Sequence, residues 1–257
     1  MKISFSKYQG TGNDFIMIDT RTMSMLEEQS VIARLCHRKW GVGADGLIFI
    51  KRDAEIDFYM KYYNADGRES SMCGNGGRCA VAFSKRLGII SDKTCFRAMD
   101  GMHTALIKGD IISLQMRDVL VVEHHPTHVF LNTGSPHHVV FVPSVDDLDV
   151  FNKGRRIRHG APYFEEGVNV NFVERVGGVL KIRTYERGVE DETLSCGTGT
   201  VAAAIAAYHT GKVTVDRINL NTSGGLLSVS FKEDSNIYKE IRLKGPAQWV
   251  FDGCIDI

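Results

Sequence analysis

The sequence of 257 residues has no excess of charge of one sign, because 31 Lys and Arg residues balance 31 Asp and Glu residues. Such a surface has no long-range positive field, so neither nucleic acid nor a membrane surface is expected as a partner. No stretch approaches the ~18 consecutive apolar residues of a membrane span, and the first residues contain no apolar segment typical of an export signal. A small-molecule ligand and a cytoplasmic location are therefore expected.

Several motifs of other chemistries are also missing, among them GxxxxGK[ST], GxGxxG after a strand, and HExxH. None of the six cysteines is part of a CxxC pair, so no metal site is expected despite nine histidines. In a reducing compartment the cysteines remain thiols. Four of them lie in apolar or unremarkable segments and are interpreted as packing residues: Cys36, Cys79, Cys95 and Cys254.

The sequence contains one internal repeat. The segment Cys73–Gly88 aligns with Cys196–Gly211 at a constant offset, since 196 − 73 = 211 − 88 = 123. The same offset relates Gly101 to Gly224. A gene duplication is the simplest explanation, and it predicts two halves with a common fold.

Each half reads as a strand, a polar turn, Cys-Gly-x-Gly, a helix that ends at glycine, and further strands. Every side chain of Val201–Ala207 is apolar, so this helix should be surrounded by its own sheet. The strands are predicted at Ile56–Tyr63, Thr94–Ala98, Ile111–Met116, Val179–Tyr185, Val213–Leu220 and Leu226–Phe231. The basic segment Lys153–Arg158 is predicted as a solvated loop.

The predicted fold class is α+β, with two lobes related by a pseudo-twofold axis. Each lobe is expected to be a curved, mostly antiparallel sheet wrapped around a central helix. The N-terminal lobe should comprise residues 1–118, completed by 246–257, and carry Cys73. The C-terminal lobe should comprise residues 119–245 and carry Cys196.

Cys73 and Cys196 are the strongest candidates for chemistry, because each precedes a predicted helix at an equivalent position. A helix start favours a thiolate or a bound carboxylate, and the flanking glycines allow a ligand to approach the backbone. Two thiols that face one cleft can invert an α carbon, one removing a proton and the other returning one to the opposite face. We therefore predict a cofactor-independent amino-acid epimerase.

Six segments together resemble the diaminopimelate epimerase family: Gly10–Phe15, Tyr63–Gly67, Met72–Cys79, Gly134–His137, Tyr185–Gly188 and Ser195–Gly199. The resemblance runs from end to end. It implies conversion of LL-diaminopimelate to the meso form, without pyridoxal phosphate or metal, in lysine and cell-wall precursor biosynthesis. It also implies a homodimer.

The resemblance assigns roles to individual residues. Cys73 and Cys196 match the family's base and acid, and His137 and Glu186 match positions that tune the cysteines or contact the substrate ammonium. The backbone sites for the α-carboxylate match Gly74, Asn75, Gly197 and Thr198, and the remaining substrate contacts match Asn13, Asn64, Asn169, Glu186 and Arg187. Two positions depart from the family, because Ser135 replaces an asparagine and Gly46 replaces a glutamine found in some members.

Two alternatives remain open. A proline or hydroxyproline racemase would use the same two thiols, but its cleft should have an apolar wall in place of Asn64, Asn169 and Arg187. A thiol redox sensor would instead join Cys73 and Cys196 in a disulfide on oxidation.

Overall fold

The computed structural model describes residues 2–22 and 27–256. The chain forms two compact units, one made of Met1–Leu114 with Gly245–Ile257 and the other of Gln115–Lys244. Each unit contains one Cys-Gly-x-Gly segment, so the fold of each is described separately.

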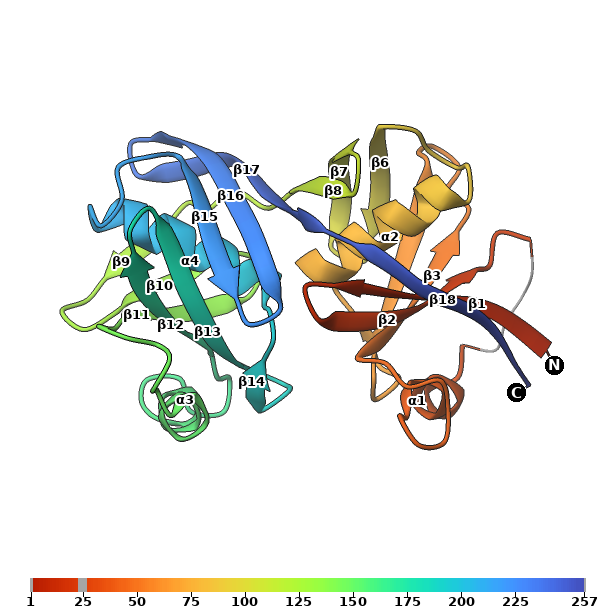
Figure 1. The fold of residues 1–257 in the computed structure, drawn as a ribbon, viewed down its shortest axis with the longest axis horizontal. Coiled ribbons are helices and arrows are strands. Elements are labelled where there is room, and N and C mark those ends of the chain that lie inside the picture. Colours follow the sequence, from red (N-terminus) through yellow and green to blue (C-terminus); the bar gives the residue numbers. More distant parts are fainter. Residues whose placement is uncertain (1, 23–26, 257) are drawn as a thin grey trace. The chain divides into compact units, whose positions relative to one another are not determined.

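The first unit is a sheet with two helices (Figure 1). Its elements are β1 (Lys2–Gly10), β2 (Asn13–Asp19), α1 (Gln29–Cys36), β3 (Gly46–Lys51), β4 (Phe58–Asn64), β5 (Glu69–Ser70), α2 (Gly74–Arg86), β6 (Lys93–Ala98), β7 (Gly101–Lys108), β8 (Ile111–Gln115) and β18 (Gln248–Asp256). Strand β1 pairs antiparallel with β18 and β2, β2 is parallel to β3, and β3 is antiparallel to β4. Beyond β4 the sheet continues through a parallel pairing with β6 and antiparallel pairings to β7 and β8.

Helix α2 packs on this sheet against β1, β2 and β3. Small residues make the close contact possible. A Cβ atom on Gly77 would lie 2.8 Å from Met72 Sδ and 3.0 Å from Leu114 Cδ2, so a larger residue would push the helix away from its neighbours.

The second unit repeats this plan. Its elements are β9 (Val122–His124), β10 (Val129–Asn132), β11 (Pro136–Phe141), α3 (Val150–His159), β12 (Asn169–Val176), β13 (Val179–Glu186), β14 (Asp191–Thr193), α4 (Gly197–His209), β15 (Arg217–Thr222), β16 (Gly225–Asp234) and β17 (Ile237–Pro246). Strand β11 is parallel to β12, β12 antiparallel to β13, and β13 parallel to β15. These pairings reproduce the order β2, β3, β4 and β6 of the first unit.

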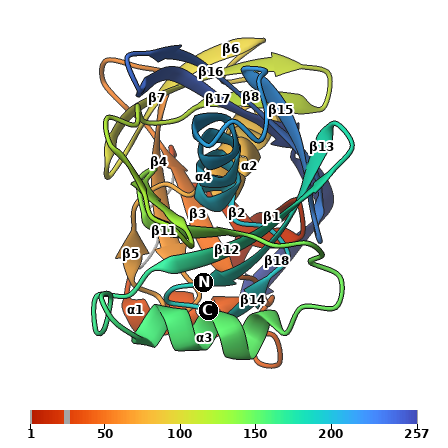
Figure 2. The ribbon, with the colours of Figure 1, turned by 90° about the vertical axis from the view of Figure 1, so that its left-hand side faces the viewer.

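Helix α4 forms the centre of the second unit. Its residues from Thr200 to Ala207 are buried, and strands β10 to β13, β15 and β16 pack against it (Figure 2). The apolar run in the sequence predicted this environment correctly. The predicted α+β class is confirmed, with parallel pairs inserted in sheets that are otherwise antiparallel.

The two central helices also match residue for residue. Since 197 − 74 = 209 − 86 = 123, both their starts and their ends are related by the offset of the sequence repeat.

Three predictions of local structure were wrong. The segment Lys153–Arg158 lies in helix α3, not in a loop; Asp149 caps this helix, and Ile157 packs on an apolar cluster. The strand predicted from Val213 begins at Arg217, because Gly211, with φ of 69°, ends α4 in a turn that continues beyond it. Cys254 is exposed and is not a packing residue, because β18 turns that side chain to solvent.

Candidate functional site

Cys73 is the N-cap residue of α2. Its backbone is extended, and its sulfur accepts a hydrogen bond from the Gly76 N–H at 3.1 Å. The side chain is half-buried, and Ile48 and Phe15 lie against the same turn of the helix. An N-cap acceptor at the positive end of a helix is stabilised further when it carries negative charge. The thiol therefore occupies a position that favours the thiolate.

The first turn of α2 is fixed by a buried network. Arg78 donates to the Gly74 carbonyl oxygen at 3.0 Å, to Asn75 Oδ1 at 2.9 Å and to Thr11 Oγ1 at 3.1 Å. Asn75 Nδ2 in turn approaches Asn13 Oδ1 at 3.4 Å. This network connects Asn13 and Asn75 to the helix turn that Cys73 caps.

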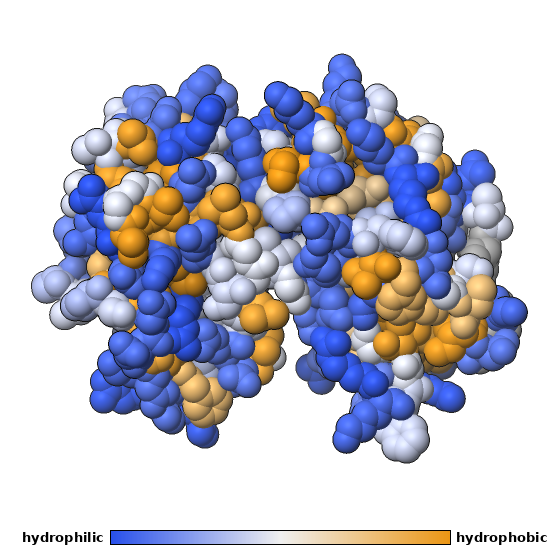
Figure 3. Space-filling view, viewed as in Figure 1, coloured by the Kyte–Doolittle hydropathy of each residue, from blue (hydrophilic) through white to orange (hydrophobic). Residues whose placement is uncertain are grey.

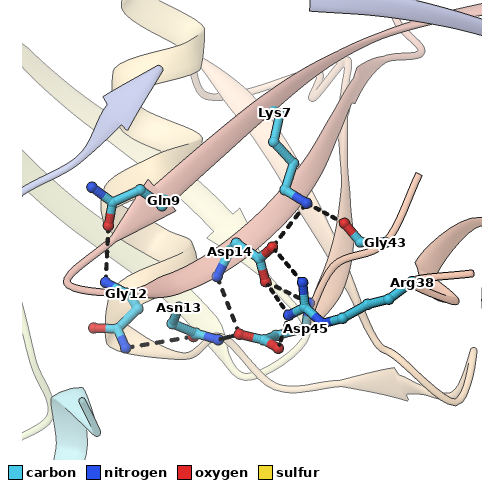
Figure 4. A network of polar contacts seen from close by, with 9 residues as sticks. Lys7, Gln9, Gly12, Asn13, Asp14, Arg38, Gly43 and Asp45 are labelled. Carbon is cyan, nitrogen blue, oxygen red and sulfur yellow. Dashed lines mark hydrogen bonds and ion pairs between the residues drawn. The ribbon is translucent and has the colours of Figure 1, made fainter. Parts of the chain in front are cut away.

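Asn13 also belongs to an ionic network at the start of β2 (Figure 4). Its amide donates to Asp45 Oδ2 at 2.7 Å, and Arg38 bridges Asp45 at 2.8 Å and Asp14 at 2.9 Å. Burial favours the neutral form of Asp14, but hydrogen bonds from Arg38 and Lys7 outweigh it and lower the pKa of this carboxyl to about 2. Lys7 also donates to the Gly43 carbonyl oxygen. These bonds hold the Asn13 amide in one orientation.

Asn64 lies apart from this network. It is exposed at the end of β4, where it pairs with Gly46 across the sheet. Its backbone N–H binds the Arg68 carbonyl oxygen at 3.0 Å.

Cys196 is the N-cap residue of α4, in the same local geometry as Cys73. Its sulfur accepts a hydrogen bond from the Gly199 N–H at 3.4 Å and lies 3.4 Å from Thr198 Oγ1. The side chain is buried. Gly197 and Thr198 begin the helix, and Thr133 Oγ1 fixes the following peptide, between Thr198 and Gly199, by donating to the Thr198 carbonyl oxygen at 2.9 Å.

His137 is fully buried beside this helix start. Burial, and secondarily the charge of Arg187, lowers the pKa of His137 to about 3, so the imidazole is neutral at physiological pH. Asn171 Nδ2 lies 3.1 Å from Nδ1, and because an amide N–H can only donate, the ring proton must be on Nε2. Among residues 2–22 and 27–256, that Nε2 has no hydrogen-bond partner. A buried N–H donor that lacks a partner among the described residues therefore lies beside the start of α4.

Asn171 connects His137 to the helix. Its Oδ1 accepts from Thr184 Oγ1 at 3.0 Å, and a Cβ atom on Gly199 would lie 2.3 Å from that oxygen. Only glycine therefore fits at position 199 without displacing the asparagine. The sequence interpretation missed Asn171, because an asparagine in an apolar strand has no recognisable motif.

A second cluster joins Asn169, Arg187 and Ser135. Asn169 Nδ2 donates to Ser135 Oγ at 2.8 Å, and the Arg187 backbone N–H donates to Asn169 Oδ1 at 2.9 Å. The Arg187 guanidinium also reaches Ser135 Oγ at 3.4 Å. Nearby, Glu186 accepts a hydrogen bond from Thr193 Oγ1 at 2.9 Å. The shorter hydroxyl of Ser135 is thus a direct partner of two predicted site residues.

Within each unit, the structure brings together most of the residues that the sequence indicates. The first unit joins Asn13, Cys73, Gly74 and Asn75, with Asn64 separate. The second places Cys196, Gly197 and Thr198 at one helix start, Asn169 and Glu186 at the ends of the adjoining strands β12 and β13, and Arg187 directly after β13. In the part of the chain that the structure describes, no group of three or more His, Cys, Asp or Glu residues could hold a metal ion. Nor is any helix among those residues long and apolar enough to cross a membrane.

Comparison with known proteins identifies the family. The sequence model of diaminopimelate epimerase matches residues 5–106 and 129–250. The chain is 54% identical over 252 residues to the diaminopimelate epimerase of Flavobacterium psychrophilum, covering 97% of this chain and 98% of the relative. It is 44% identical over 261 residues to that of Chlorobaculum tepidum, covering 96% of this chain and 99% of the relative.

Solved structures extend the likeness at the level of the fold. A Bacillus anthracis phenazine biosynthesis protein of the PhzF family superposes with a TM-score of 0.80 at 14% identity, over 100% of both chains. A probable proline racemase from Agrobacterium radiobacter superposes with a TM-score of 0.70 at 15% identity, over 99% of this chain and 93% of the other. The matches in sequence, which extend over nearly the whole chain, decide the assignment: the chain belongs to the diaminopimelate epimerase family and is an isomerase.

Proposed function

We propose that this enzyme converts LL-diaminopimelate to meso-diaminopimelate by a two-base mechanism with Cys73 and Cys196. The observation that carries the proposal is the matched position of the two thiols. Each thiol caps its helix and accepts a hydrogen bond from the backbone N–H three residues later in the chain. Four family relatives with this activity in their names align over at least 96% of the chain.

The chemistry requires the two sulfurs to act on opposite faces of one α carbon. The thiolate takes the α-proton, and the electron pair left on carbon is delocalised into the α-carboxylate. The other thiol then gives its proton to the opposite face, so one sulfur ends as thiol and the other as thiolate. The reverse reaction exchanges these roles, and no proton is gained or lost overall.

The N-terminal ends of α2 and α4 are proposed to stabilise the negative charge that develops on the substrate. The first turns of the two helices, at Gly74 and Asn75 and at Gly197 and Thr198, lie at the positive helix ends and are suited to a carboxylate that gains charge in the transition state. His137 is proposed to donate from Nε2 to the substrate or to a sulfur, since its proton lies on a buried nitrogen that lacks a partner among the described residues.

The far end of diaminopimelate is itself an amino acid, so it needs both donors and acceptors. We assign its binding to Asn13, Asn64, Asn169, Glu186 and Arg187. Arg187 offers a fork for the carboxylate, and Glu186 an acceptor for the ammonium group. These polar groups favour diaminopimelate over proline, whose ring would require an apolar wall.

Isotope exchange tests this assignment. Reduced protein incubated with LL-diaminopimelate in deuterated water should form meso product and incorporate deuterium at the inverted carbon, while proline should remain unlabelled. The Cys254→Ser variant is the matched control, because that thiol is exposed and lies outside the proposed site. Exchange with proline alone would favour the racemase alternative. A lack of turnover with any amino acid, together with reversible formation of a Cys73–Cys196 disulfide, would favour the redox sensor.

We place the reaction in lysine and cell-wall precursor biosynthesis, and in the cytoplasm. The metabolic role follows from the proposed substrate, and the location from the need to keep two thiols reduced. Growth of a diaminopimelate epimerase-deficient bacterium with and without this gene tests the metabolic role. Failure to restore growth by an expressed, active protein would contradict it.

We also propose a homodimer that forms through β18. Trp249, Val250 and Phe251 are 50%, 49% and 43% exposed, and Figure 3 shows an apolar patch over the part of the surface where β18 and β1 run in Figure 1. Adjacent exposed apolar side chains of this kind are typical of an interface. Val250→Glu should give a monomer in sedimentation, whereas Val189→Glu, at a 57% exposed position of the other unit, should not. A wild-type monomer at micromolar concentration would refute the proposal.

A further inference from the structure

Helix α2 contains a buried cation. Arg78 is 0% exposed and is the largest fully buried side chain of the described residues. Within residues 2–22 and 27–256 it forms no ion pair, since no carboxylate oxygen lies within 4.0 Å of its guanidinium nitrogens. A buried arginine without a carboxylate is unusual, because taking a charge out of water is costly.

Neutral oxygen atoms satisfy this arginine. Of its five N–H donors, four bind the carbonyl oxygens of Gly74 and Pro246, the hydroxyl of Thr11 and the amide oxygen of Asn75, at distances of 3.0, 3.2, 3.1 and 2.9 Å. These bonds fix the guanidinium at the first turn of α2 without neutralising it. Its positive charge therefore acts on whatever anion that turn holds.

The second copy lacks this charge. Since 78 + 123 = 201, the equivalent residue is Val201, which is also 0% exposed. The two N-cap cysteines thus share a backbone geometry but differ in the side chain five positions onward, which is a cation in one helix and an aliphatic group in the other.

Other titratable groups leave this difference intact. Burial raises the pKa of the Cys79 thiol, which keeps it neutral, and Asp14 is paired with Lys7 and Arg38. Beside the start of α4, the buried His137 of β11 is neutral. Two cations, Arg187 and Arg117, also lie near this start, but Arg187 is partly exposed and Arg117 is exposed, so solvent screens their charges more than that of Arg78. Burial lowers the pKa of Arg78 to about 10, which still leaves it charged at neutral pH, and the negative forms of Cys79 and Cys73 act in the opposite direction.

We propose that Arg78 is a positioning residue that makes the two thiols unequal, so that in the resting enzyme Cys73 is the thiolate and Cys196 is the thiol. The inference rests on the proposed two-thiol function. Its physical basis is that a cation fixed in a medium of low dielectric constant strongly favours a nearby anion. The resting enzyme is then prepared for proton removal by Cys73 and proton delivery by Cys196.

Site-resolved alkylation tests the ranking in the wild-type protein. Iodoacetamide is attacked by the thiolate, which forms a carbon–sulfur bond and releases iodide, so the rate at each cysteine follows its own ionisation. Peptide mass spectrometry of samples labelled from pH 5.5 to 10 should give an apparent pKa at least about one unit lower for Cys73 than for Cys196. Equal values or the reverse order would overturn the proposal.

Variants test the cause. Arg78→Met should raise the apparent pKa of Cys73 by about one unit or more and leave that of Cys196 unchanged, while Arg78→Lys should retain most of the difference. Arg86→Met is the matched control, because it removes a cation from the exposed end of the same helix and should leave Cys73 unchanged. If Arg78→Met does not fold, the wild-type ranking and the Arg78→Lys profile decide.

Alkylation needs no turnover, which separates this inference from the proposed function. A protein that shows the expected ranking but inverts no amino acid would retain the role of Arg78 and refute the epimerase. If the protein is an active epimerase but Arg78→Met leaves the apparent pKa of Cys73 unchanged, the proposed function stands and the role of Arg78 is refuted.

Discussion

The capping role of the two cysteines predicts a clean separation of stability from catalysis. Each sulfur accepts one helix N–H, at 3.1 Å for Cys73 and 3.4 Å for Cys196. Serine is among the best N-cap residues, so Cys→Ser should preserve both helices. Cys→Ala removes the acceptor and should cost about 1 kcal/mol of unfolding free energy per helix. For a chain of this size, that corresponds to a lowering of Tm by ~2–4 °C.

Catalytic activity should not follow the stability of the variants, because serine should be as poor as alanine in place of either cysteine. A serine hydroxyl is a far weaker acid than a thiol of pKa about 8.5, so serine and alanine should both slow epimerisation, by roughly 10²-fold or more. Thermal denaturation followed by circular dichroism, with NMR detection of meso-diaminopimelate, measures the two effects on the same samples. A serine variant that keeps a tenth of the wild-type rate would refute the acid–base role. Serine variants that melt below their alanine counterparts would refute the capping argument.

Three further predictions concern other parts of the molecule. Burial, and then the charges of His128 and His125, lowers the pKa of His138 to about 3, so between about pH 6.5 and 3 the unfolded chain binds a proton that the folded chain excludes. Stability should therefore fall as the pH drops below about 6.5, by up to about 1.4 kcal/mol per pH unit for this group, and urea unfolding of His138→Asn should show a shallower decline. Gly199→Ala should reduce both Tm and kcat, because its Cβ would lie 2.3 Å from Asn171 Oδ1. Gly178→Ala should change neither, because a Cβ atom added there would have no neighbouring atom within 4 Å. Equal effects of the two variants would contradict the close contact at Gly199. Asp45→Ala should raise KM more than it lowers kcat, because it removes the acceptor that orients the Asn13 amide, and an unchanged KM in steady-state assays would argue against a binding role for Asn13.

The sequence predicted those features of the fold that depend on local pattern. The offset between Cys73 and Cys196 predicted two equivalent helices, and their bounds obey it at both ends. The all-apolar run Val201–Ala207 predicted a helix with no exposed face, and α4 is buried along that run. Both predictions depend on periodicity and composition, which a single sequence displays directly.

What the sequence concealed are contacts that depend on tertiary packing. Charge alone suggested a loop at Lys153–Arg158, yet α3 forms because Val150 and Gly154 face the sheet. Lys153, Arg155 and Arg156 are exposed, whereas Arg158 is largely buried and pairs with Glu190. Gly154 is required there, since a Cβ atom would lie 2.3 Å from Tyr185 Cβ. Arg78 was similarly hidden, because a lone arginine on a helix is usually exposed, and only the fold shows that it is fully buried.

The duplication explains why some candidate residues of the two units occupy equivalent positions and others do not. The helix starts at Gly74 and Gly197 obey the offset, and inversion of a carbon needs a donor and an acceptor of the same kind on its two faces. Other equivalent positions have diverged: 46 + 123 = 169, and Gly46 corresponds to Asn169.

In this chain the packing around Gly46 leaves little room for a side chain. A Cβ atom on Gly46 would lie 2.6 Å from Tyr62 Cε2 and from the Tyr63 carbonyl oxygen, so a larger residue would require these neighbours to move. In the second copy Asn169 occupies the position and binds Ser135 and the Arg187 backbone. On the proposed function, the diverged position bears on substrate choice, whereas the two matched helix starts bear on the reaction common to both directions.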